Sequence, residues 1–285
     1  MLLWTTDIHL DFLMPPGAAK IFAEYMAAEN PEAEALIITG DISHAKGIEN
    51  HLKELAAGFQ KPIYFVLGNH DYYYSSFDDV DARVARVVKN LPNVHWLNKG
   101  WHEHNGVVIV GTNGWYDAYH GNTYTKAHLN DFYEIKDLMP GIHYHDLLLQ
   151  LVRARAGKES DQLAKLLKDA CETDSEVIIV ATHVAPYPEA AWYNGQPSER
   201  EMMPWFSSAS TGAVLDIYSK KYPEKTFIVL CGHCHDSGIY QRRENMIVYT
   251  GRARYRHPDL AGVIDTQNRK LWAYDSVSQK VERTY

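Results

Sequence analysis

Five short apolar segments of the chain end abruptly in polar side chains. Residues 63–67 are apolar and stop at the motif Gly68-Asn69-His70-Asp71. A short apolar run bounded by turn-forming residues is typical of a buried strand, so this segment predicts a strand that ends in a polar site. The other four runs are 2–6, 36–39, 177–181 and 227–230, and they lead to Asp7-Ile8-His9, Gly40-Asp41, Thr182-His183 and Cys231-Gly232-His233-Cys234-His235.

Helical patterns alternate with the first of these strands. They cover about 18–28, 48–58 and 79–91, which gives a repeated strand-helix order. This order predicts a layered α/β fold in which much of the sheet is parallel. An open sheet of this kind gathers ligand-binding residues at the carboxyl ends of its strands. We therefore expect the polar strand ends to meet at one edge.

The regular alternation ends after the apolar run 107–111. Residues 112–157 are rich in Trp, Tyr and His and precede a predicted helix at 160–171, and residues 185–210 form a second irregular region. Long connections in a compact domain are usually functional, so these two cap segments are expected to stand over the strand ends. Short apolar runs separated by turns after residue 237 predict antiparallel strands. No shift in composition marks a second domain, and residues 1–285 are interpreted as one.

Composition narrows the class of protein. With 285 residues, 46% hydrophobic and 22% charged, the chain is an ordinary globular protein. Its net charge of −8 disfavours nucleic acid as a partner, because phosphates would be repelled. No apolar run is long enough to span a membrane and no signal sequence is visible. Three cysteines suit a reducing compartment, so a cytoplasmic location is expected, and the oligomeric state stays open.

The residues at the strand ends form a mixed nitrogen and oxygen ligand set, which suits Mn, Fe or Zn. Residues i and i+2 of an extended chain point to the same side. Asp7 and His9 can therefore both reach one metal site, and so can His233 and His235. One tetrahedral ion takes about four ligands, so this set predicts two ions. Two-metal sites stabilise in-line phosphoryl displacement, which implies hydrolysis of a phosphoester. The full set is Asp7, His9, Asp41, Asn69, His70, His183, His233 and His235.

In this order, the five motifs resemble those of the calcineurin-like metallophosphoesterases. The resemblance spans residues 7–235 and rests on the combination, because each motif alone is weak. It implies a four-layer α-β-β-α sandwich of two mixed sheets, here with an aromatic and His-rich cap. It also implies a substrate that is a small phosphomonoester or phosphodiester.

The resemblance also implies a role for each residue. Asp7, His9 and His235 would bind the first metal, and Asp41 would bridge both ions. A hydroxide held by the metals would attack phosphorus, and His70 would protonate the leaving group. The second metal would be bound by Asn69, His183 and His233.

The second motif departs from a common form of the family. Many members carry an acid three residues after the bridging Asp, where it orients the catalytic imidazole, but this chain has His44 there. The residue that orients His70 is therefore open. Either Asp71 helps to hold the imidazole, or His44 has a different role, such as a substrate contact.

Four further residues are candidate substrate contacts. Trp115 and Tyr116 would form a wall of the pocket, with aromatic packing between cap and body as the alternative. His120 lies in the same cap segment. Arg252 alternates with Arg254 and would clamp a phosphate, with a solvated strand face as the alternative.

Two rival functions stay open, and a redox function is disfavoured. A nuclease of the same family would need a basic track to the metals, and the sequence has no run rich in Lys or Arg. A binding scaffold without catalysis would be expected to have lost ligands, and none is lost. Cys231-Gly232-His233-Cys234 has the spacing of a redox motif, but it lies late in the chain and precedes a predicted hairpin rather than a helix.

Overall fold

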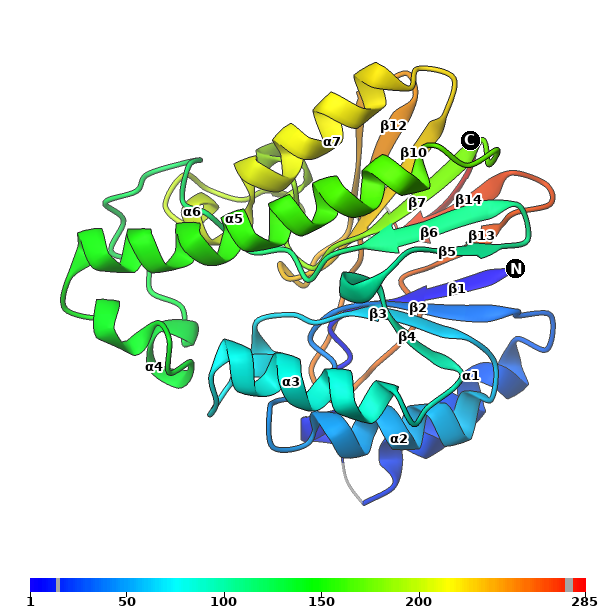
Figure 1. Ribbon diagram of the computed structural model, residues 1–285, viewed down its shortest axis with the longest axis horizontal. Coiled ribbons are helices and arrows are strands. Elements are labelled where there is room, and N and C mark those ends of the chain that lie inside the picture. The colour runs from blue at the N-terminus through cyan, green and yellow to red at the C-terminus, as the bar shows by residue number, and fades with distance from the viewer. Residues whose placement is uncertain (14–15, 275–278) are drawn as a thin grey trace.

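Two β-sheets face each other between outer layers of helices, as the α-β-β-α prediction requires (Figure 1). The computed structural model describes residues 1–13, 16–274 and 279–285. The first sheet has the order β15-β14-β13-β1-β2-β3-β4, in which β1 to β4 are parallel and β13 to β15 are antiparallel. Its strands are β1 (Leu2–Thr5), β2 (Ala35–Thr39), β3 (Ile63–Val66), β4 (Val94–Trp96), β13 (Gly262–Asp265), β14 (Lys270–Tyr274) and β15 (Lys280–Thr284).

The second sheet has the order β11-β12-β10-β7-β6-β5. The pattern after residue 237 predicts antiparallel strands, but β12 is antiparallel only to β11 and runs parallel to β10. Short β4 and β5, and exposed β15, are absent from the prediction because they bury too few side chains to show a strand pattern. The strands are β5 (His102–His104), β6 (Val107–Gly111), β7 (Val177–Ala181), β10 (Thr226–Cys231), β11 (Gly238–Arg243) and β12 (Met246–Thr250).

The core has two layers because both faces of the central strands are covered. In β1, Leu2 and Trp4 pack between the sheets, whereas Leu3 joins the cluster that contacts the helices. Ile179 and Leu230 belong to the inter-sheet cluster and come from the opposing sheet. Burial on both faces explains why these strands are continuous apolar runs rather than alternating ones.

Helices cover the outer face of each sheet (Figure 1). The first sheet carries α1 (Ala18–Glu29), α2 (Ile48–Phe59) and α3 (Phe77–Val88), close to the predicted bounds. The second carries α5 (His145–Ala170) and α7 (Ala209–Lys221). The helix predicted at 160–171 begins earlier than expected, because α5 starts at His145 and takes up the last part of the cap segment 112–157. Buried Arg155 and Glu159 interrupt the apolar face of α5, which hides its helical period in the sequence.

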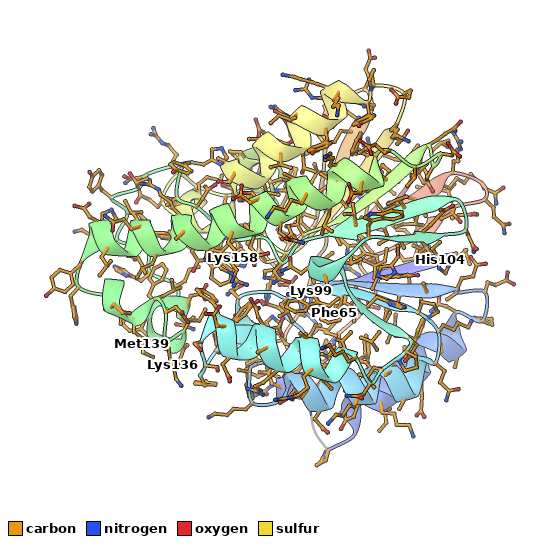
Figure 2. The ribbon with its side chains drawn as sticks, in the orientation of Figure 1. Phe65, Lys99, His104, Lys136, Met139 and Lys158 are labelled. Carbon is orange, nitrogen blue, oxygen red and sulfur yellow. The ribbon has the colours of Figure 1, made fainter. Side chains whose placement is uncertain are left out.

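The two cap segments lie beyond one end of the sheets, where Figure 1 shows α4 and α6. In Figure 2, Lys136 and Met139 mark the cap, and His104 marks the opposite end of the sheets. The short elements of the chain are α4 (Asp131–Glu134), α6 (Met203–Phe206), β8 (Trp192–Tyr193), β9 (Gln196–Pro197) and the 3-10 turns η1 (Leu10–Phe12), η2 (His70–Tyr72), η3 (Leu97–Lys99), η4 (Met139–Gly141) and η5 (Pro188–Ala190).

A buried ion-pair network joins α5 to α3 and to the turn η2. Arg155 lies 2.7 Å from Glu159 and 3.2 Å from Asp81, and it donates to the Tyr72 hydroxyl at 2.6 Å. Tyr72 directly follows the polar motif that ends at Asp71. Because a buried charge needs partners, the network fixes η2 against the long helix.

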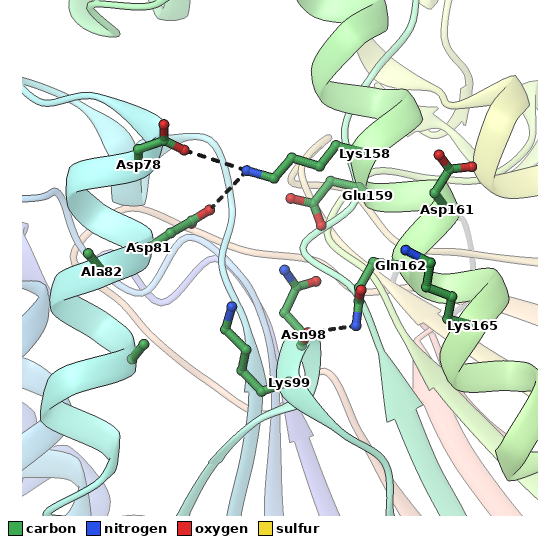
Figure 3. A pocket seen from close by; sticks show the side chains of 11 residues that line it. Asp78, Asp81, Ala82, Asn98, Lys99, Lys158, Glu159, Asp161, Gln162 and Lys165 are labelled. Carbon is green, nitrogen blue, oxygen red and sulfur yellow. Dashed lines mark hydrogen bonds and ion pairs between the residues drawn. The ribbon is translucent and has the colours of Figure 1, made fainter.

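A cavity of about 630 Å³ opens beside this network, between α3 and α5 (Figure 3). Lys158 reaches across it to Asp78 and Asp81, and Gln162 donates to the backbone carbonyl of Asn98. Its lining carries charges of both signs, of which Lys158 pairs with Asp78 and Asp81. The cavity is separate from the polar strand ends.

Among the helices in the described ranges, none combines the length and apolar character needed to cross a membrane.

Candidate metal centre

The loops after β1 and β2 continue side by side beyond the ends of their strands. The backbone N–H of Asp7 donates to the carbonyl of Gly40 at 3.0 Å, and that of His9 donates to the carbonyl of Asp41 at 3.0 Å. On the second sheet, Gly232 N–H donates to the His183 carbonyl at 2.9 Å. Within each sheet, these bonds hold the polar residues of neighbouring strands together at the carboxyl ends of the strands, as expected from the strand order.

Most of the predicted ligands have an uncommon backbone conformation. Asp7, His9, Asp41, His233 and His235 all have positive φ angles, between 42° and 72°. Such angles are uncommon for residues with a side chain, and they cluster where function demands them. The two pairs of residues therefore meet through left-handed turns, and the expectation of an extended backbone at these pairs is wrong.

Glycines allow the loops to approach closely. A Cβ atom on Gly68 would lie 2.1 Å from Asp41 Oδ1, and one on Gly232 would lie 2.1 Å from Asp7 Oδ2. Both positions exclude any side chain. Each glycine thus lets backbone from one strand end reach a carboxylate from another.

Four predicted ligands gather in a first group. Atoms of Asp7, His9, Asp41 and His235 all lie within 4.8 Å of one another. The Nε2 atoms of His9 and His235 are 3.1 Å apart, and His235 Nε2 is 3.5 Å from Asp7 Oδ1. Nitrogen and carboxylate oxygen at this spacing form a donor set that fits a transition-metal ion.

The three other predicted ligands form a second group, in which two histidines face the carboxamide oxygen of Asn69. This atom lies 2.9 Å from His183 Nε2 and 2.9 Å from His233 Nδ1. The remote nitrogen of each imidazole donates to a backbone carbonyl, that of Thr39 at 2.8 Å and that of Trp205 at 2.8 Å. A hydrogen bond of this kind fixes the ring and turns the other nitrogen toward a metal. The residues present therefore fit a second ion.

Asp41 lies between the two groups. Its Oδ1 is 3.3 Å from His183 Nε2 and its Oδ2 is 3.8 Å from His9 Nε2. The same Oδ1 accepts from the backbone N–H of His70 at 2.9 Å. Each oxygen of the Asp41 carboxylate thus faces a histidine of a different group, as the oxygens of a bridging ligand would.

The electrostatics of the cluster are dominated by burial and by the carboxylates. Burial lowers the pKa of His9 to about 3 and that of His233 to about 4, so both are neutral at pH 7, as ligands must be. Burial also opposes charge on His183, but Asp41 and Asp7 outweigh it and raise the pKa of His183 to about 10. Despite burial, His183 and His70 hold the pKa of Asp41 well below its usual range.

His70 stands at the wall of the cluster, with its side chain 19% exposed. Its Nε2 is 3.9 Å from Asp41 Oδ2, and its ring stacks on Tyr73 with centroids 4.3 Å apart. Asp71 faces elsewhere, because its carboxylate accepts from Ser43 N–H at 2.7 Å and Gly68 N–H at 2.8 Å. Asp71 therefore holds the loop rather than the imidazole. The half-buried His44 packs edge-on against Tyr74, and among the described residues its Nδ1 has no hydrogen-bond partner.

A cavity of about 290 Å³ opens over both groups. Residues from the cap segments and from the loop after β12 complete its wall. Sequence patterns gave no sign of Tyr255, whose ring lies 4.5 Å from that of His9 and 4.8 Å from that of His235, or of the cap residue Asp131. The wall consists of Asp41, Asn69, His70, Tyr73, Leu129, Asn130, Asp131, Tyr193, Phe206, His233, Cys234, His235 and Tyr255.

The four candidate substrate contacts lie outside this wall. Trp115 and Tyr116 are fully buried, which favours the alternative of aromatic packing between cap and body. His120 bonds to Ser207 Oγ at 3.0 Å. Arg252 stacks on Tyr274 and lines a separate cavity of about 240 Å³ beside Asp7.

The cysteine pair of the last motif does not resemble a redox site. Cys231 and Cys234 are buried and free, and burial raises the pKa of both thiols, that of Cys231 to about 12. Reactive thiols have lowered pKa values, so both cysteines are interpreted as buried packing residues.

Comparison with known proteins assigns the chain to a protein family. Residues 2–237 match the calcineurin-like phosphoesterase family, and the chain belongs to that family. An uncharacterized protein of Acanthamoeba polyphaga mimivirus is 21% identical over 98% of this chain and 97% of its own.

Solved structures share the fold at low sequence identity. A phosphopantetheinyl hydrolase from Mycobacterium tuberculosis has a TM-score of 0.64 and 15% identity, covering 90% of this chain and 89% of its own. A dimetal phosphatase from Danio rerio has a TM-score of 0.62 and 12% identity, and the match covers 100% of this chain and 98% of that one. These likenesses confirm a metallophosphatase fold with two mixed sheets.

Replacement of Gly68 by Ala tests the close approach at the cluster. We expect Gly68→Ala to lower the free energy of unfolding of the metal-free protein by about 1–3 kcal/mol, because the new methyl collides with Asp41. Urea unfolding measures the change. The control is Gly157→Ala within α5, where a Cβ would meet no atom within 4 Å. There we expect the free energy of unfolding to rise by about 0.5–1 kcal/mol, because alanine favours a helix over glycine. Equal stability of Gly68→Ala and the native protein would contradict this geometry.

Metal binding should release protons. His183 is protonated at pH 7 without metal because its pKa is about 10, and a metal must displace that proton to bind. We therefore expect the affinity for Mn to rise with pH from about 6 to about 9. Isothermal titration calorimetry in buffers of different ionisation enthalpy measures the protons released. Binding that releases no proton would exclude His183 as the displaced group.

Proposed function

We propose that the protein hydrolyses a small phosphoester with two transition-metal ions, Mn, Fe or Zn, bound at this cluster. The observation that carries the proposal is the position of Asp41 between the two groups of ligands, at the floor of the cavity. The first ion would be held by Asp7, His9 and His235. The second would be held by Asn69, His183 and His233.

Ions bound there would supply Lewis-acid polarisation of the phosphoryl group and activation of a water molecule. The protein itself supplies an acid for the leaving group. His70 borders the cavity beside Asp41, and stacking on Tyr73 limits the directions that its ring can take. A positioned acid of this kind contributes about 10²–10⁴-fold to a rate.

The shape of the cavity supports a small substrate. Its volume of about 290 Å³ is at the lower end of small-molecule sites, and Tyr193, Phe206 and Tyr255 border it. A duplex would need an open basic track, whereas the net charge is −8. The two similar structures are those of a hydrolase and a dimetal phosphatase, in line with this chemistry.

A substrate panel tests this proposal directly. The metal-free protein, reloaded with Mn, Fe or Zn, is assayed against phosphomonoesters, cyclic nucleotides, small phosphodiesters, and single- and double-stranded DNA and RNA. We expect turnover of at least one small ester and little cleavage of polymers. Far faster cleavage of nucleic acid would favour a nuclease. A metal-loaded protein that is inert toward every ester would favour a binding scaffold.

Substitution of His70 separates catalysis from metal binding. His70→Ala should lower kcat by about 10²–10⁴-fold, because the leaving group loses its proton donor. Both metals should remain bound, which elemental analysis measures. The matched control is His102→Ala, a half-buried histidine on β5, which should leave kcat unchanged. Loss of the metals in His70→Ala, or an unchanged kcat, would contradict the assigned role.

A further inference from the structure

A buried carboxylate from the cap reaches the cluster from outside the family motifs. Asp131 is the first residue of α4 and is 1% exposed. It lies in the cap segment 112–157 and lines the cavity over the two groups of ligands. Burial of a carboxylate is costly without hydrogen bonds, so its contacts indicate what it does there.

Three side chains donate hydrogen bonds to Asp131. Its Oδ1 accepts from Asn69 Nδ2 at 2.9 Å and from the Tyr73 hydroxyl at 2.6 Å. Its Oδ2 accepts from the Tyr116 hydroxyl at 2.7 Å. The two oxygens of Asp131 thus accept three hydrogen bonds, and the carboxylate acts here as an acceptor.

This arrangement determines which way the carboxamide of Asn69 faces. Because the Asp131 oxygen accepts this hydrogen bond, the group of Asn69 that faces it is the NH₂. The carboxamide oxygen then faces His183 and His233, each 2.9 Å away. A flipped amide would offer a metal the NH₂, which is not a ligand.

The two tyrosines that donate to Asp131 also pack against neighbouring functional side chains. Tyr73 stacks on His70, with ring centroids 4.3 Å apart. Tyr116 lies parallel to the His233 ring, with centroids 6.1 Å apart and an interplanar angle of 27°. Asp131 thus connects the cap to one carboxamide and, through two tyrosines, to two imidazoles.

We propose that Asp131 is a positioning residue that holds the Asn69 carboxamide oxygen toward the second metal. The inference rests on the proposed function, because it requires the second ion. It assigns to the cap a part in metal binding, in addition to covering the cavity. The cap residue sets the affinity of one metal of the pair and leaves the other unaffected.

The test measures the affinity of each metal separately by Mn titration calorimetry and equilibrium dialysis. Asp131→Ala should lower the affinity for the second metal by about 10–100-fold, the usual cost of removing a partner that orients a ligand. The first metal, bound by Asp7, His9 and His235, should keep its affinity within about threefold. Equal weakening of both ions, or no weakening, would overturn the proposal.

Asp117→Ala is the matched control. Asp117 is also a fully buried carboxylate of the cap, and it accepts from Ser210 N–H at 2.7 Å and Ser210 Oγ at 2.8 Å without touching a predicted ligand. The Asp117→Ala substitution should destabilise the protein without selectively lowering the affinity for the second metal. If Asp117→Ala reproduces the selective loss, Asp131 acts through the general order of the cap and the proposal fails.

A double-mutant cycle with Asn69→Ala gives the sharpest result. Once the carboxamide is absent, Asp131→Ala should cause no further loss of the second metal. Additive losses would show that Asp131 acts independently of Asn69 and would overturn the proposal.

A second variant covers the case in which Asp131→Ala does not fold. Asp131→Asn keeps the volume and one acceptor oxygen, and it should weaken the second metal by less than about tenfold with the first unchanged. An equal effect on both metals, or none, would contradict the proposal. A native protein that binds fewer than two ions would refute the proposed function instead, so the two failures are distinguishable.

Discussion

A fully buried carboxylate, that of Asp41, is the constraint on which the site depends. It lies where loops of both sheets meet, and charges in such a position persist only when they are paired. The backbone N–H of His70 and the imidazole of His183 supply those partners from two other strands. Although burial opposes its charge, the imidazoles of His183 and His70 hold the pKa of Asp41 well below its usual range.

The rest of the local structure follows from bringing several strand ends to this carboxylate. Positive φ angles at five of the predicted ligands turn their side chains inward, and Gly68 and Gly232 remove the atoms that would otherwise collide. Such strain persists only where surrounding structure holds it. The two-layer core and the network around Arg155 provide that rigidity, because they fix the strands and the turn η2 that carry the ligands.

The parts of the site that the sequence could predict are those encoded locally. Each motif joins a buried strand to a polar residue within a few positions, so the strand order alone brings residues such as Asp7 and His183 to one edge. Asp131 and Tyr255 could not be found in this way, because their roles depend on how the cap and the loop after β12 fold back on the cluster. The same reason applies to Asp71, which lies beside His70 in sequence but bonds to Ser43 and Gly68.

Anomalous diffraction from crystals loaded with Mn tests the central claim most directly. The account predicts two peaks per chain, one among Asp7, His9 and His235 and one among Asn69, His183 and His233, with Asp41 between them. A single peak, or metal bound away from these residues, would contradict it.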